Sequence, residues 1–177
     1  MSMANSIILG GGCFWCIEAV FSGVRGVIST KSGYSGGHTS HPTYQEVCAK
    51  NTGHAEVVLV EYDDTSINLQ TILQIFFAAH NPTQLNHQGD DVGPQYRSCI
   101  FLMDETNMTH VEKSMTAAEL LWDRPLTTTV ETLDKFWPAE AEHDDYFALH
   151  SQQPYCATVI SPKVAKVRAS FSELYES

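Results

Sequence analysis

The chain has 177 residues, which suits one domain, and 43% of them are hydrophobic, enough for a sizeable core. It carries 21 acidic and 10 basic residues, a formal net charge of −11, and no cluster of Lys and Arg, which argues against a nucleic-acid-binding surface. No apolar run is long enough to cross a bilayer and the start lacks the pattern of a secretory signal, so we expect a cytoplasmic protein.

Hydrophobic periodicity and turn residues predict alternating strands and helices along the chain. We expect strands at 6–9, 54–63, 99–103 and 126–132. A further strand begins at 26 and leads into a glycine-rich loop that ends at 37. We expect helices at 13–21, 43–50, 68–80, 107–122 and 139–149, and a last helix from about Lys163. Residues 81–98 form a long polar loop, and loops of this length in compact domains are usually functional or disordered.

The order of these elements indicates the fold class. Through residue 103 the chain reads strand, helix, strand and then again strand, helix, strand. Helices packed on one face of a mixed sheet satisfy this order, as in a two-layer ferredoxin-like plait. We therefore predict an α+β fold with one domain over residues 1–177.

The stretch GGGCFWC at 10–16 carries the strongest local signal. A dinucleotide-binding turn would need a third glycine where Trp15 stands. A zinc site would need a second close pair of ligands, but the other three cysteines are isolated, so we expect no metal. An odd count of five cysteines without a signal peptide also argues against a disulfide-stapled secreted fold.

A redox function of this stretch fits its composition. Cys13 follows a strand and a glycine turn and opens a helix, where backbone amides and the helix dipole favour the thiolate. Cys16 lies one turn later, within reach of Cys13, although its apolar neighbours also suit a buried structural cysteine. Phe14 and Trp15 form an apolar wall beside the thiol or pack in the core, and Trp is rarely fully buried.

Five motifs together resemble one known family. GCFWC, GYSGG with PTY, TGHAEVV, NHQGDDVGPQYRS and a tail with YF followed by PYC are similar, in this order, to motifs of the A-type peptide-methionine sulfoxide reductases. They cover most of the chain, from Gly11 to about Pro162. The resemblance implies a single catalytic domain over 1–177 that reduces the S-epimer of methionine sulfoxide, free or in proteins. It also implies a plait with extra C-terminal helices and irregular segments.

The resemblance assigns roles to individual residues. Cys13 matches the nucleophile, and Glu56 matches the acid that protonates the sulfoxide oxygen, with a pKa raised by burial. By itself, the pattern around Glu56 favours an ordinary strand-end carboxylate facing solvent. Tyr44 and Tyr96 match hydroxyl donors to the sulfoxide oxygen. Asp91 matches a carboxylate that binds the substrate's amino group or backbone through water.

The remaining site residues concern the substrate methyl group and recycling. Phe14 and Trp15 match the pocket for the sulfur methyl, with Tyr155 at its rim. Cys156, in a tail of about 150–177 that we expect to be mobile, matches the recycling cysteine of many members. Cys16 matches the variant with the recycling cysteine inside the signature. We expect Cys156 to act first and Cys16 to accept the disulfide in a second step.

Other partners and alternatives follow from the same residues. We expect thioredoxin as the reductant, no metal or organic cofactor, no nucleic acid or membrane partner, and a monomer. Cys48 and Cys99 are expected to be structural. One alternative is a thioredoxin-like dithiol exchanger, but residues 54–103 lack the expected strand–proline pattern. Another is a module that binds oxidised methionine without catalysis, against which the presence of Cys13 and Glu56 argues.

Overall fold

The computed structural model describes residues 4–175 and contains a six-stranded sheet with the strand order β7-β6-β1-β3-β2-β8. The pair β6 and β7 is parallel and the other neighbouring pairs are antiparallel, so the sheet is mixed, as predicted. The strands are β1 (Ala4–Gly10), β2 (Val27–Ser35), β3 (Ala55–Asp63), β6 (Cys99–Leu102), β7 (Thr129–Thr132) and β8 (Phe136–Pro138).

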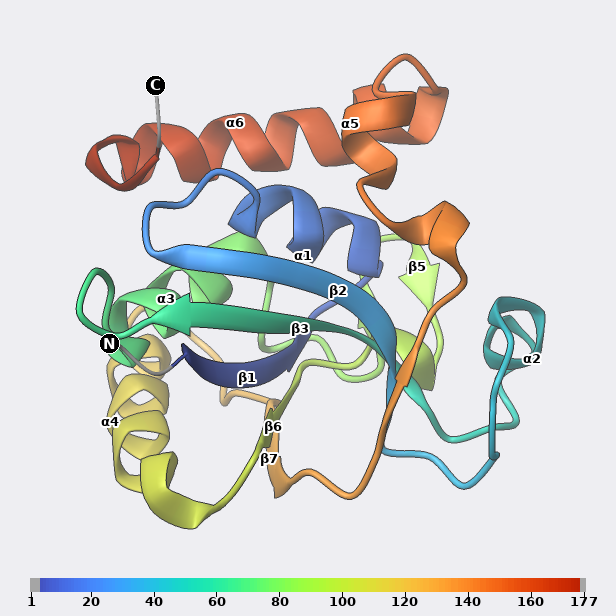
Figure 1. Cartoon of the computed structure of the whole chain (residues 1–177), viewed down its shortest axis with the longest axis horizontal. Helices are drawn as coiled ribbons and strands as arrows, with labels where there is room; N and C mark the ends of the chain where they lie inside the picture. The colour runs from blue at the N-terminus through green and yellow to red at the C-terminus, as the bar shows by residue number, and fades with distance from the viewer. Residues whose placement is uncertain (1–3, 176–177) are drawn as a thin grey trace.

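Helices cover one face of this sheet. The α-helices are α1 (Phe14–Phe21), α2 (Tyr44–Cys48), α3 (Leu69–Ala79), α4 (Met108–Glu119), α5 (Tyr146–His150) and α6 (Ser161–Ser170). In Figure 1, α1, α5 and α6 lie above the strands, while α2 and β5 (Asp91–Val92) lie at the opposite end of the molecule from α4. Within residues 4–175, no helix combines the length and apolar character that crossing a membrane requires.

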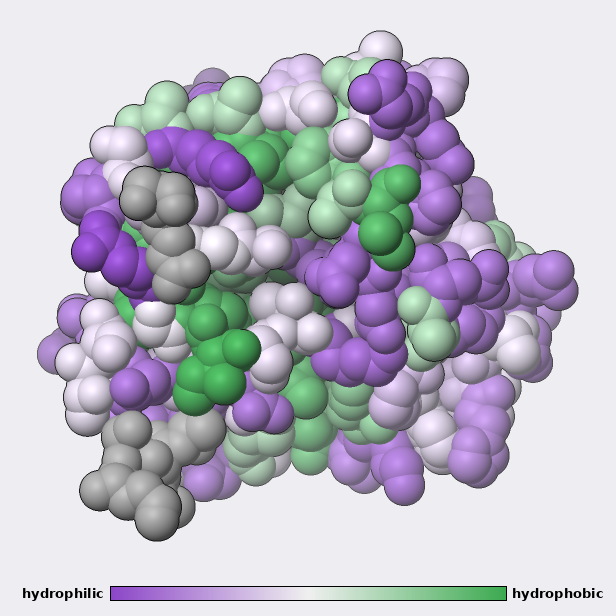
Figure 2. All heavy atoms as spheres, turned by 45° about the horizontal axis from the view of Figure 1, so that its top comes forward, coloured by the Kyte–Doolittle hydropathy of each residue, from purple (hydrophilic) through white to green (hydrophobic). Residues whose placement is uncertain are grey.

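Every second side chain along the strands points toward the helices and forms the main core. Ile7, Leu9, Val58 and Val60 are fully or almost fully buried against the helices. Their neighbours in sequence point to the other face, where Ile8 packs in a smaller apolar cluster. Figure 2 shows the face on which α6 comes forward, where apolar side chains form separate patches between strongly hydrophilic ones.

The predicted α+β class is confirmed, and the main differences lie in the second half of the chain. The stretch 81–98 holds a small hairpin, β4 (His87–Gln88) with β5, followed by a 3-10 turn at Pro94–Tyr96. The helix expected at 139–149 is broken, because Asp145 adopts a left-handed conformation with φ +53 before α5 begins. A π-helical turn at Cys156–Ile160 precedes α6. Strand β8 was not predicted, since three residues ending in proline show no periodicity.

Candidate active site

The turn between β1 and α1 presents Cys13 at the start of the helix, as the glycines predicted. Gly12 has φ +89, a left-handed conformation that strongly favours glycine, and its N–H donates to the Tyr96 carbonyl at 3.1 Å. Gly11 packs so closely on His80 that a Cβ would lie 2.8 Å from the imidazole ring. The turn is therefore held between His80 and the segment that carries Tyr96.

The electrostatic environment of Cys13 differs from the expectation based on its helix position. The side chain is only 6% exposed. Burial raises the pKa of the Cys13 thiol well above its usual value, and the nearby Glu56, Cys16 and Asp91 raise it further. The hydrogen bond from the Trp15 backbone opposes this shift but does not outweigh it. The free protein therefore holds Cys13 as a thiol.

Glu56 lies on the same face of β3 as Val58 and is 1% exposed, so the carboxylate is buried rather than facing solvent. Its Oε1 accepts a hydrogen bond from the Phe14 N–H at 3.2 Å, one residue after Cys13. Its Oε2 is buried and has no hydrogen-bond partner among the described residues. Burial raises the pKa of Glu56 to about 8, the bond from Phe14 opposes the rise, and Asp91 adds to it. At neutral pH the carboxyl is mostly protonated, and Oε2 can carry the proton.

Tyr44 and Tyr96 lie near this acid. Burial raises the pKa of both tyrosines, and the nearby Glu56 and Cys13 raise it further. Both hydroxyls therefore keep their protons and remain donors at physiological pH. Tyr44 begins α2, directly after Thr43, whose side chain accepts from the Glu46 N–H in a capping box.

Glu140 is a site residue that the sequence did not reveal. Its carboxylate accepts from the Tyr44 N–H at 3.0 Å and from the Tyr34 hydroxyl at 2.9 Å. It thereby ties β2 and α2 to the segment that follows β8. No motif around Glu140 pointed to this position, because its partners lie about a hundred residues earlier in the chain.

Asp91 and Tyr155 come together from distant parts of the chain. The Tyr155 hydroxyl donates to Asp91 Oδ2 at 2.6 Å, and it lies 4.0 Å from the Cys16 sulfur. Burial raises the pKa of Tyr155, and the charges of Cys13, Cys16 and Asp91 raise it further. The structure thus brings together the predicted residues Cys13, Cys16, Glu56, Tyr44, Asp91, Tyr96 and Tyr155.

The two aromatic residues of the signature differ in exposure. Phe14 is fully buried, whereas Trp15 is half-buried. The Trp15 indole N–H donates to His143 Nδ1 at 3.1 Å, and its ring stacks on Tyr146 with centroids 3.7 Å apart. Burial lowers the pKa of His143, which keeps Nδ1 free to accept this hydrogen bond. Of the two signature aromatics, only Trp15 presents open surface to a ligand.

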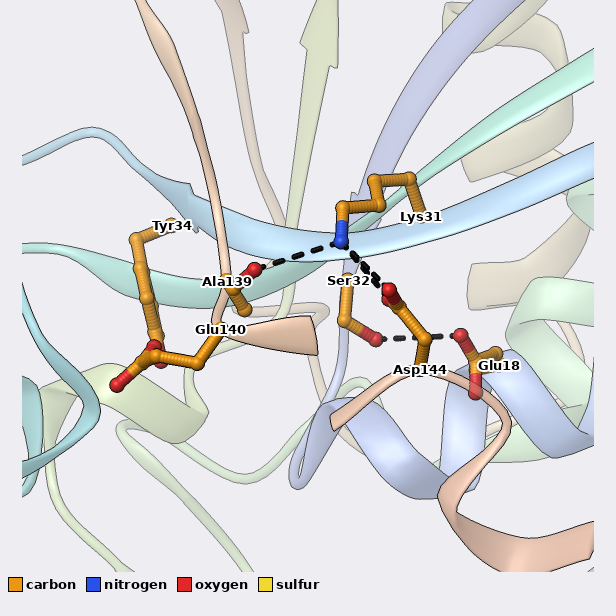
Figure 3. Close-up of polar contacts among 7 residues, drawn as sticks. All are labelled: Glu18, Lys31, Ser32, Tyr34, Ala139, Glu140 and Asp144. Carbon is orange, nitrogen blue, oxygen red and sulfur yellow. Dashed lines mark hydrogen bonds and ion pairs between the residues drawn. The ribbon is translucent and has the colours of Figure 1, made fainter. Parts of the chain in front are cut away.

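The segment 139–145, which carries Glu140 and His143, is anchored to β2 by Lys31 (Figure 3). The Lys31 ammonium contacts both carboxylate oxygens of Asp144, at 2.9 and 2.8 Å, and the Ala139 carbonyl at 3.4 Å. On α1, the buried Glu18 accepts from the Ser32 hydroxyl at 3.4 Å. Burial raises the pKa of Glu18 to about 7, and the charge of Asp145 raises it further. These contacts hold the segment against β2 and α1.

Cys156 is fully buried at the start of the π-helical turn, which is a correction to the mobile tail we expected. Apolar packing covers the thiol, because this turn and α6 pack against α1. All five cysteines are free in this structure. Cys99 is fully buried and Cys48 is half-buried.

The comparison with family models decides which family this is. The model of the family described as peptide methionine sulfoxide reductase matches residues 5–175. The chain belongs to this family. It is an A-type peptide-methionine sulfoxide reductase, an oxidoreductase of protein repair.

Individual relatives agree with this assignment over nearly their full lengths. The chain is 51% identical to the peptide methionine sulfoxide reductase MsrA of Chromobacterium violaceum, over 96% of this chain and 98% of that one. It is also 51% identical to MsrA of Ralstonia nicotianae, over 95% of this chain and 91% of that one. Among solved structures, reduced Mxr1 from Saccharomyces cerevisiae matches with a TM-score of 0.82 at 30% identity, covering 86% of this chain and 89% of the yeast chain.

Among the described residues, one cluster of two carboxylates and an imidazole lies near the site. This cluster does not suit a metal ion. Glu140, Glu142 and His143 bring ligand atoms within 4.8 Å of one another. However, His143 Nδ1 already accepts from Trp15, and both Glu140 oxygens accept hydrogen bonds. The cluster therefore orders the aromatic side chains of this reductase, and a cation would compete with those hydrogen bonds.

Proposed function

We propose that this reductase converts the S-epimer of methionine sulfoxide, free or in proteins, to methionine through a sulfenic acid on Cys13. An intramolecular disulfide then forms and is reduced by thioredoxin in the cytoplasm, where such dithiol systems operate. The observation that carries the proposal is the buried carboxyl of Glu56, mostly protonated at neutral pH and bonded to the backbone beside Cys13.

The first step transfers oxygen from the substrate sulfur to Cys13. Glu56 protonates the sulfoxide oxygen while the Cys13 sulfur attacks the substrate sulfur, and the proton of the Cys13 thiol is released to the vacated carboxylate. The hydroxyl then passes from the substrate sulfur to the Cys13 sulfur. The substrate S–O bond and the bond formed between the two sulfurs both break, which leaves methionine and a sulfenic acid on Cys13. The substrate sulfur is reduced by two electrons and the Cys13 sulfur is oxidised by two.

The surrounding side chains fit recognition of a methyl sulfoxide. The protonated hydroxyls of Tyr44 and Tyr96 stabilise developing charge on the oxygen, and their raised pKa values support this role. Trp15, backed by Phe14, supplies the apolar surface for the sulfur methyl, with Tyr155 at the rim. Asp91 binds the substrate's amino group or backbone through water.

The placement of the thiols favours an order of recycling opposite to the one expected from the sequence. Cys16 lies one helical turn from Cys13, with its N–H donating to the Cys13 carbonyl at 3.0 Å. Cys16 lies near enough to Cys13 to raise its pKa, and Cys156 raises the pKa of Cys16 in the same way. We infer that Cys16 condenses with the Cys13 sulfenic acid, releasing water, and that Cys156 then exchanges into the disulfide once its turn opens.

This order predicts which intermediate accumulates when one cysteine is removed. In Cys16→Ser, the sulfenic acid on Cys13 should persist after one turnover and react with dimedone. In Cys156→Ser, mass spectrometry should find a Cys13–Cys16 disulfide instead. Both variants should still release one methionine per enzyme. A dimedone adduct in Cys156→Ser together with a Cys13–Cys156 disulfide in Cys16→Ser would show that Cys156 acts first.

The stereochemical part of the proposal has its own test. With dithiothreitol as reductant, the protein should reduce a methyl S-sulfoxide at least about 100-fold faster than its R-epimer, because the oxygen of the R-epimer points away from the donors when the methyl occupies its pocket. Chiral chromatography of the remaining substrate measures both rates. Equal rates for the two epimers contradict the proposed site geometry.

The same geometry supports a ferredoxin-like plait as the core of the domain. The strands β6-β1-β3-β2 are neighbours in this order and antiparallel throughout, and α1 and α3 form the two crossovers. We assign β7, β8, α4, α5 and α6 as additions to this core.

A further inference from the structure

A groove of about 980 Å³ lies between α3, α4 and α6, outside the set of residues that surround the Cys13 thiol. Helix α3 packs between α4 and α6, so it forms the floor, and the other two helices form the walls. The apolar lining includes Phe77 on the floor, Leu121 and Trp122 at the end of α4, and Phe171 after α6. Nothing in the chemistry proposed above uses this groove.

The charged side chains that line the groove are positive, whereas the net charge of the whole chain is negative. The protein has 21 acidic and 10 basic residues, yet the lining contains three lysines and no Asp or Glu. Lys113 stands on the α4 wall, and Lys163 and Lys166 stand on the α6 wall. None of the three has a carboxylate within ion-pair distance in the described part of the chain. The groove therefore complements a ligand that is apolar and negatively charged.

The shape of the apolar surface favours a polypeptide over a small amphiphile. Leu120 follows directly after α4, precedes the groove-lining Leu121 and is 83% exposed, so the apolar surface continues beyond the groove. A small ligand enclosed in the groove would leave Leu120 in water. Side-chain amides, including Gln70 and Gln74, also line the groove and can pair with the polar backbone of a peptide.

The groove borders the turn that carries Cys13. His80 and Gln88 line the groove, and they also pack on this turn: a Cβ at Gly11 would lie 2.8 Å from His80, and one at Gly12 would lie 2.9 Å from Gln88. A chain lying in the groove therefore sits on the other side of His80 and Gln88 from the reactive thiol. One polypeptide can occupy the groove and present another part of itself to Cys13.

We propose that the groove docks an acidic, apolar segment of a polypeptide substrate whose oxidised methionine is reduced at Cys13. This inference rests on the proposed function and adds a substrate class to it. Docking converts the encounter of the sulfoxide with Cys13 into an intramolecular step, so substrates with such a segment react at lower concentration. Because the lysines are exposed or half-buried, the contribution of charge weakens as salt rises.

Binding can be tested without any sulfoxide. The probe is a fluorescein-labelled 16-residue peptide of Leu, Phe and Glu without methionine, followed by fluorescence anisotropy at low salt. The double variant Lys113→Glu, Lys166→Glu should weaken binding at least about 10-fold, since both lysines become repulsive. The matched control Lys50→Glu, Lys135→Glu makes the same change in net charge outside the groove and should bind as the wild type does. Equal weakening in both double variants would overturn the proposal.

Activity measurements then link the groove to catalysis. In the wild type, a methionine sulfoxide peptide with an added Leu-Phe-Glu segment should have a higher kcat/KM than the same peptide with an added Ser-Gly segment. The groove variant should lose most of this advantage. Its thioredoxin-driven turnover of free methionine sulfoxide should be unchanged. A comparable loss on free substrate would assign the groove to the reductant and overturn the proposal. Because the binding probe contains no sulfoxide, an error in the proposed reaction would leave the binding result intact.

Discussion

Replacing Cys13 with serine is expected to abolish sulfoxide reduction, with a loss of kcat of about 10⁴-fold or more, because no other group supplies the attacking sulfur. The hydroxyl of serine is a far weaker nucleophile and cannot form a sulfenic acid. The loss should extend to the first turnover, before any recycling is needed. The fold should be unaffected, because the serine side chain is nearly the same size and its oxygen can accept the hydrogen bond from the Trp15 backbone.

Single-turnover release of methionine, measured without external reductant, checks this result. Cys156→Ser is the control, because it removes an equally buried thiol that is not needed for the first step. It should release one methionine per enzyme, whereas Cys13→Ser releases none. One methionine per enzyme from Cys13→Ser would move the nucleophile to another cysteine, with Cys16 the first candidate.

The position of Cys13 could be predicted from the sequence because its causes are local. A strand, a turn rich in glycine and the start of a helix lie within about ten residues, and Gly12 adopts the positive φ that such a turn needs. The strong apolar periodicity of 54–63 and 68–80 likewise predicted β3 and α3. Asn68 caps α3, accepting from the Thr71 N–H at 2.8 Å.

The protonation states could not be predicted from the sequence, because they depend on burial by distant segments. The thiol of Cys13 and the carboxyl of Glu56 are buried by a fold that brings together the hairpin at 87–92, the segment 139–145 and the turn at 156–160. None of these segments shows a clear period, so each was predicted as a loop, a plain helix or a mobile tail. The contacts of Glu140 and the burial of Cys156 could not be predicted for the same reason, since their partners are remote in sequence.

Glu56→Gln is expected to lower the rate of sulfoxide reduction about 10²- to 10⁴-fold, which is the usual contribution of a positioned general acid. The amide has nearly the same shape and its oxygen can still accept from the Phe14 N–H, so packing is retained. It cannot give up a proton to the sulfoxide oxygen. In the wild type the acid form is lost as the pH rises through about 8, so the reduction rate should fall above that pH. In Glu56→Gln that decline should disappear, since the titrating group is gone.

The stability of this variant separates a chemical role from a structural one. The folded protein binds the Glu56 proton more tightly than the unfolded chain does, because burial raises the pKa from its usual 4.5 to about 8. The wild type therefore loses stability as the pH rises through this range, and the uncharged amide does not. We expect the Tm of Glu56→Gln, relative to the wild type, to be higher at pH 9 than at pH 5, while its activity remains low at both. Rates near those of the wild type at pH 7 would show that another group protonates the sulfoxide.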